Sequence, residues 1–142
     1  MRARLLAPLL LVPLAVAAAA MARPSTTPTS TRATVDVKLR EWKITPSQRR
    51  ARAGKITFVA HNTGKLEHEL VVIRSNRPAD HLPLEGRDAS EMGSRGEIDG
   101  VMPGNTGRLT LDLRPGKYVL ICNRSDHDGH YEHGMFAAFT VS

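Results

Sequence analysis

The sequence predicts an all-β domain, either a sandwich or a barrel. Three observations point to it. Short runs of residues alternate between apolar and polar with a period of two, Gly, Pro and Asn separate these runs, and no internal repeat or long helical period is present. Such a succession of short strands and turns is typical of all-β sandwiches and barrels.

The first 22 residues are predicted to be a secretory signal peptide. Arg2 and Arg4 precede an apolar run from 5 to 20, and Ala20-Met21-Ala22 gives a small-x-small ending. We expect cleavage after Ala22, or else after Ala20. An uncleaved anchor is the alternative, but this run is shorter than the ~20 residues that a spanning helix needs. The mature protein is therefore expected in the periplasm or elsewhere outside the cytoplasm, without stable membrane insertion.

Residues 23–33 are predicted to form a flexible leader. The segment is rich in Pro, Ser and Thr and has no large apolar residue, so it cannot contribute to a core. The folded domain is then expected to span 34–142, which is long enough to bury one modest core.

The strands of this domain follow from the alternation. Val35, Val37 and Leu39 alternate with charged residues, and the dipeptide Pro115-Gly116 marks a turn between two strands. The segment 74–106 is long for a loop in a compact domain, so we expect it to contain a strand near 97–101, with a short helix as the alternative. The expected strands are 35–39, 55–61, 69–74, 97–101, 109–113, 117–122 and 135–141.

Charge and composition exclude some functions. Without Arg2 and Arg4, 18 Lys and Arg remain against 14 Asp and Glu, which gives a net charge of +4. Aromatic residues make up only 4% of the chain, so the sequence gives little support for nucleic-acid binding. A basic cluster at Arg49, Arg50 and Arg52 could steer an acidic partner protein or could simply be a solvated face.

The single cysteine is the most informative residue. Cys122 ends a predicted strand, and the following loop carries three histidines before Met135 opens the last strand; they are His127, His130 and His133. A thiolate, an imidazole and a thioether together favour copper. Zinc could also bind Cys and His, but the Met and the lack of a Cys-x-x-Cys pair argue against a structural zinc site.

A trigonal copper site needs a second imidazole from elsewhere in the chain. His68 is the candidate, because it stands at the head of the strand 69–74, after the turn Asn62-Thr63-Gly64. A ligand at a strand head can meet a loop at the same end of a sandwich. The residues alone leave open whether His127 or His130 is the imidazole that the loop contributes.

Three segments resemble the cupredoxins. NTGKLEHELVV, RPGKYVLICN and GHYEHGM are similar to the motifs of small exported members of that family. The resemblance implies a Greek-key β-sandwich and a type 1 copper site with His68, Cys122, His130 and Met135 as ligands. His127 has the usual spacing from the cysteine, but the Gly-His-Tyr context and the spacing to Met135 favour His130.

The resemblance also implies a function. We expect one copper ion per chain, electron transfer to transient redox partner proteins, a monomer, no enzymatic activity, and a position of His130 near the surface as the exit for electrons. Copper storage, delivery or sensing is the alternative, and catalysis would need further ligands. Glu69 stands where many relatives have Asn, and its carboxylate would lower the copper potential if it points inward.

Overall fold

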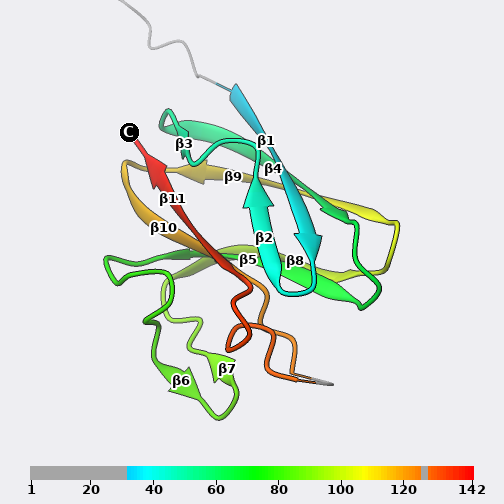
Figure 1. Ribbon diagram of the computed structural model, residues 1–142. Helices are drawn as coiled ribbons and strands as arrows, with labels where there is room; N and C mark the ends of the chain where they lie inside the picture. The colour runs from blue at the N-terminus through cyan, green and yellow to red at the C-terminus, as the bar shows by residue number, and fades with distance from the viewer. Residues whose placement is uncertain (1–31, 126–127) are drawn as a thin grey trace, which may run out of the picture.

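The computed structural model describes residues 32–125 and 128–142, which form a β-sandwich (Figure 1). The predicted signal peptide and most of the predicted leader lie outside these residues. Within the described ranges the strands are β1 (Arg32–Arg40), β2 (Lys43–Pro46), β3 (Arg50–Ala51), β4 (Gly54–Asn62), β5 (His68–Arg74), β6 (Leu84–Glu85), β7 (Asp88–Ala89), β8 (Ser94–Val101), β9 (Thr106–Leu113), β10 (Gly116–Ile121) and β11 (Phe136–Val141).

Two sheets form the sandwich. The first has the strand order β2-β1-β4-β9, and the second has the order β3-β11-β10-β5-β8. Most neighbours are antiparallel, but β1 runs parallel to β4 and β3 runs parallel to β11. The chain crosses between the sheets after β2, β3, β4, β8 and β9, so the predicted Greek-key β-sandwich is confirmed.

The core lies between the sheets and follows the predicted period of two. Val35, Val37 and Leu39 of β1 are completely buried, while the charged residues between them are exposed. Phe58 of the first sheet meets Phe139 of the second at 5.4 Å between ring centroids, in an edge contact. Burial of these apolar faces holds the two sheets together.

The second sheet is buried on its outer face as well. Val71 and Ile73 of β5 and Val119 and Ile121 of β10 pack there against a smaller cluster that includes Leu82, Ala89 and Tyr131. The segment 75–93, which contains the small β6–β7 hairpin, supplies part of this cover. Since β5 is covered on both faces, its sequence is a continuous apolar run rather than an alternating one.

The predicted strands are present, with corrections at their ends. β1 begins at Arg32, two residues before the predicted domain start, because Arg32 and Ala33 already pair with β4 and Ala33 packs against the core. β8 begins at Ser94 rather than near 97. Four further strands, β2, β3, β6 and β7, were not predicted, because they have only two to four residues and therefore show little alternation.

One end of the sandwich gathers the segments that matter for function. Figure 1 shows the turn between β1 and β2 at the same lower end as the loop between β10 and β11. The head of β5 joins them there through His68, which pairs with Val101 of β8. In the described part of the chain there is no helix that could cross a membrane.

Candidate metal centre

Three predicted ligands meet at this end of the sandwich. The Nδ1 atoms of His68 and His130 are 3.3 Å apart, and the Sγ atom of Cys122 is 3.3 Å from Nδ1 of His130 and 3.8 Å from Nδ1 of His68. All three side chains are buried. The structure thus brings together residues that are 54 and 8 positions apart in the sequence.

Two of the three donors are fixed by neighbouring strands of the second sheet. His68 is the first residue of β5, and Cys122 directly follows β10, which pairs with β5. Cys122 has the same parity as Tyr118 and Leu120, so its side chain points into the core. The backbone N–H of Glu69 donates a hydrogen bond to Sγ of Cys122 over 3.4 Å, which ties the two strands together at the donors.

The loop between β10 and β11 brings His130 back to the same point. Its backbone N–H donates to the carbonyl of Arg124 over 2.9 Å, and its own carbonyl accepts from Met135 over 3.1 Å. Cys122 and Met135 are joined by a further backbone hydrogen bond of 3.0 Å. The side chain of Met135 is completely buried and belongs to the same core cluster as Cys122. Its role as the axial ligand stays a prediction.

The geometry of the three donors suits one metal ion. The centre of the triangle they form lies about 2 Å from each atom, which is a normal length for metal–nitrogen bonds and slightly short for metal–sulfur bonds. Burial raises the pKa of the Cys122 thiol to about 11. The hydrogen bonds from the backbone N–H groups of Glu69 and Arg124 lower this pKa, but by less than burial raises it. Because the thiolate is the metal ligand, binding must displace this proton. Two imidazoles and one thiolate, with a thioether close by in the chain, suit a single copper ion.

Glu41 contacts the first imidazole. Its Oε1 lies 3.3 Å from Nε2 of His68, on the side of the ring away from the other donors. The same oxygen accepts hydrogen bonds from the backbone N–H groups of Lys65 and Leu66, over 2.7 and 2.6 Å. Burial opposes ionisation of Glu41, but the backbone hydrogen bonds, above all the one from Leu66, outweigh it and lower the pKa to about 2. Glu41 is therefore an anion beside His68.

Trp42 contacts the second imidazole. Its indole meets the ring of His130 edge to face at 5.2 Å and stacks on His133 at 4.6 Å. His130 is only 1% exposed, so the expectation that its ring approaches the surface is wrong. The expectation failed because nothing in the loop sequence indicates that a residue of the β1–β2 turn packs against this histidine.

Glu69 points toward the loop between β10 and β11, residues 122–135 (the ligand loop), rather than into solvent. Its Oε1 accepts a hydrogen bond from the backbone N–H of Asn123 over 2.7 Å. Burial raises the pKa of Glu69 to about 7. The hydrogen bond from Asn123 lowers this pKa, and the nearby carboxylates of Glu91, Asp99 and Glu97 raise it. Glu69 thus links the strand that carries His68 to the residue after Cys122.

Tyr131 holds the ligand loop against the outer segment of the second sheet. Its hydroxyl donates to the carbonyl of Ala79 over 2.8 Å and accepts from the backbone N–H of Leu82 over 2.9 Å. Since Tyr131 directly follows His130, these bonds also restrict the backbone that presents the imidazole. Its place in the GHYEHGM motif was the only signal in the sequence that marked it.

The remaining histidines do not join the cluster as far as the structure describes them. His61 contacts Asp36 and Thr106, and His81 contacts Asp80. His133 is half-exposed and stacks on Trp42. His127, the alternative ligand, lies outside the described residues.

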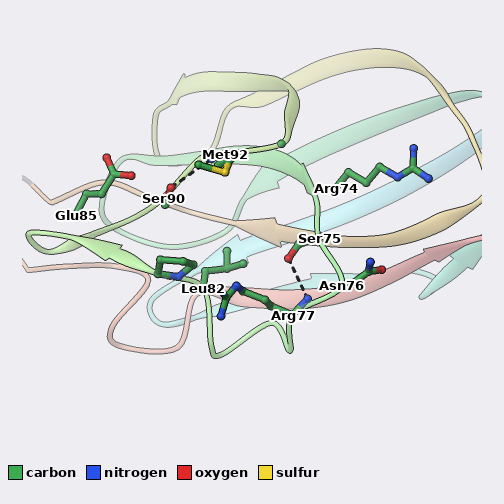
Figure 2. Close-up of a pocket in the computed structure, with 10 residues that line it drawn as sticks. Arg74, Ser75, Asn76, Arg77, Leu82, Glu85, Ser90 and Met92 are labelled. Atoms are coloured by element: carbon green, nitrogen blue, oxygen red, sulfur yellow. Dashed lines mark hydrogen bonds between the residues drawn. The ribbon is translucent and has the colours of Figure 1, made fainter.

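A cavity of about 780 Å³ lies between the end of β5 and the segment 75–93 (Figure 2). Figure 2 shows Arg74 and Arg77 along its wall together with Leu82 and Met92. None of the four predicted ligands lines it, so this cavity is separate from the metal centre.

Comparisons with known proteins establish the fold. No protein-family model and no curated protein sequence matches the chain. Among solved structures, the dithionite-reduced auracyanin of the photosynthetic bacterium Roseiflexus castenholzii is 20% identical with a TM-score of 0.55, and the alignment covers 80% of this chain and 98% of that one. Auracyanin B is 19% identical with a TM-score of 0.58, covering 82% and 93%.

Rusticyanin is a third structural neighbour. The structure from Thiobacillus ferrooxidans is 15% identical with a TM-score of 0.54, and the alignment covers 77% of each chain. Another rusticyanin structure, 16% identical with a TM-score of 0.53, is described as that of a copper protein. At these identities the likeness shows the fold alone. The predicted cupredoxin fold is confirmed.

Proposed function

We propose that this cupredoxin-fold chain is an exported electron carrier whose single copper ion is held by His68, Cys122, His130 and Met135. One observation carries the proposal: two imidazole nitrogens and one thiol sulfur form a triangle with edges of 3.3 to 3.8 Å, buried at one end of the sandwich. A trigonal His₂Cys site with a weak axial Met is the arrangement of blue-copper electron carriers. The description of a structural neighbour as a copper protein supports the choice of metal.

The bound copper would supply a one-electron change between Cu(I) and Cu(II). The chain's part is to keep the donors in nearly the same place in both states. His68 and Cys122 lie on paired strands, and backbone hydrogen bonds tie the loop residue His130 to Arg124 and Met135. A site held in this way needs little rearrangement when the charge changes, which keeps the barrier to electron transfer low.

Burial of the donors favours the carrier over a storage or delivery protein. His68 and Cys122 are 0% exposed and His130 is 1% exposed, so an acceptor could not reach the metal without moving the loop or Trp42. A delivery protein would need donors that exchange readily with those of its acceptor.

The setting of the carrier follows from the predicted signal peptide. We propose a monomer located in the periplasm or elsewhere outside the cytoplasm, without enzymatic activity. It would exchange electrons with partner proteins in short encounters, which small interfaces suit. Gel filtration tests whether the protein is a monomer, and fractionation of cells tests its location.

Addition of Cu(II) to the purified protein tests the function. We expect one equivalent to give an intense blue colour and a single EPR species, both lost and regained reversibly on reduction and reoxidation. A protein that stays colourless and passes Cu(I) to a chelator would contradict the carrier and favour delivery.

Two matched histidine variants test the ligand assignment. His130→Ala should abolish the blue site, whereas His127→Ala should retain it, because His130 is the imidazole whose Nδ1 lies 3.3 Å from Sγ of Cys122. The opposite pattern would transfer the ligand role to His127.

A further inference from the structure

We propose that Glu41 is a positioning residue for the copper site, which directs Nδ1 of His68 toward the metal and favours Cu(II) through its negative charge. This inference rests on the proposed function and adds a residue from the turn between β1 and β2. Glu41 lies 27 positions before His68, and no motif in the sequence connects the two residues.

The carboxylate of Glu41 determines which nitrogen of the His68 imidazole carries the proton. An ionised carboxylate can only accept hydrogen bonds, and Oε1 of Glu41 is 3.3 Å from Nε2 of His68. A carboxylate at this position favours the tautomer with the proton on Nε2. That tautomer leaves the lone pair of Nδ1 directed toward Cys122 and His130, as a metal ligand requires.

The loop before His68 holds the carboxylate of Glu41 in place. Its Oε1 accepts two backbone hydrogen bonds, from Lys65 and Leu66, which lie just before His68 in the chain. Gly64 leaves the space for it, because a Cβ atom built on that residue would come within 2.6 Å of Oε1 and 2.7 Å of Oε2. Glu41 is thus fixed by the same loop that leads into the ligand strand.

The negative charge of Glu41 acts on the metal that His68 would bind. The Glu41 side chain is only 24% exposed and His68 is 0% exposed, so water screens the interaction between them weakly. A fixed negative charge next to a ligand imidazole stabilises the oxidised, more positive metal more than the reduced one. Removal of this charge should therefore raise the reduction potential.

Glu41→Gln isolates the charge from the hydrogen bonds. The two N–H groups of Lys65 and Leu66 need an acceptor, so the amide should turn its oxygen toward them and keep the loop in place. We expect this variant to keep the blue spectrum while the equilibrium constant for reduction rises about tenfold, which is about 59 mV for a one-electron couple.

Gly64→Ala is an independent variant that changes no charge. Gly64 has no positive φ, so alanine is compatible with its backbone, and the new Cβ must displace the flexible end of Glu41. The potential should rise here too, by less than in Glu41→Gln. Asp112→Asn is the matched control, since it removes an equal charge from an exposed side chain of β9 that pairs with Lys55, at the opposite end of β4 from the metal centre. Its effect should stay below about twofold because distance and water screen that charge.

The experiment combines voltammetry of the copper-loaded variants with ¹⁵N NMR of the metal-free wild type. We expect the proton of His68 on Nε2. The potentials should fall in the order Glu41→Gln, then Gly64→Ala, then Asp112→Asn and wild type together. Equal potentials for Glu41→Gln and Asp112→Asn, or a proton on Nδ1 of His68, would overturn the role of Glu41. If the wild type forms no blue site, the proposed function fails, and the tautomer of His68 still decides whether Glu41 positions it.

Discussion

The ligand loop, residues 122–135, and the turn between β1 and β2 contribute to the metal centre in different ways. The loop supplies donor atoms: Sγ of Cys122, Nδ1 of His130 and, by prediction, the sulfur of Met135. The turn supplies none, yet Glu41 contacts one imidazole and Trp42 contacts the other. The loop therefore provides atoms that bind the metal, whereas the turn orients and covers the imidazoles that bind it.

The largest effect is expected in the ligand loop, from Cys122→Ser. A hydroxyl is a harder donor than a thiolate and stays protonated, so the blue colour should disappear and copper affinity should fall. Visible absorption and competition with a copper chelator measure both. A variant that keeps wild-type colour and affinity would show that the cysteine is not a ligand.

Tyr131→Phe tests how the ligand loop is anchored. The variant removes a hydroxyl that satisfies both the carbonyl of Ala79 and the buried N–H of Leu82. Leaving these groups without a partner should lower the free energy of unfolding by about 2 kcal/mol, measured by urea denaturation of the metal-free protein.

Tyr118→Phe is the control for this loss. Its hydroxyl donates a single hydrogen bond, to the carbonyl of Arg114, so the cost should be about 1 kcal/mol. Equal costs for the two variants would mean that Tyr131 does not hold the loop more firmly than an ordinary tyrosine.

Trp42→Leu tests the turn as a cover of the site. Without the indole, His130 loses its edge contact and water gains access to the imidazole. Copper transfer to a strong chelator should become about tenfold faster, in line with the usual effect of residues that surround a metal site. Trp42→Phe, which keeps an aromatic face, should give a smaller change, and an unchanged rate in Trp42→Leu would contradict the covering role.

The smallest effect is expected for His133→Ala. His133 is half-exposed and stacks on Trp42 without joining the cluster. Its loss should leave the copper spectrum unchanged and alter the free energy of unfolding by no more than about 1 kcal/mol, the value of one aromatic contact. Loss of the blue colour in this variant would show that the loop uses a different histidine.

The donor residues of the ligand loop could be predicted from the sequence. Donor residues are recognisable because only a few residue types bind copper, and Cys122, His130 and Met135 lie within one short segment between two strands. The alternation in β1 and β9 likewise predicts strands, because a half-buried strand repeats every two residues.

Contacts between distant strands could not be predicted in this way. Glu41 and Trp42 lie near the imidazoles because β1 pairs in parallel with β4 and the β1–β2 turn then falls at the ligand end. That register is set by the packing of the whole sandwich, and a Glu-Trp pair in a turn has no local signature. The β6–β7 hairpin was missed for a similar reason, since its strands have two residues each.

X-ray absorption at the copper edge, on protein loaded with one equivalent of copper, identifies the atoms that bind the metal. We expect one sulfur and two nitrogen atoms within bonding distance, about 2 Å from the metal. A first shell of nitrogen and oxygen atoms without a short sulfur would contradict it, because Cys122 would then take no part in binding the metal.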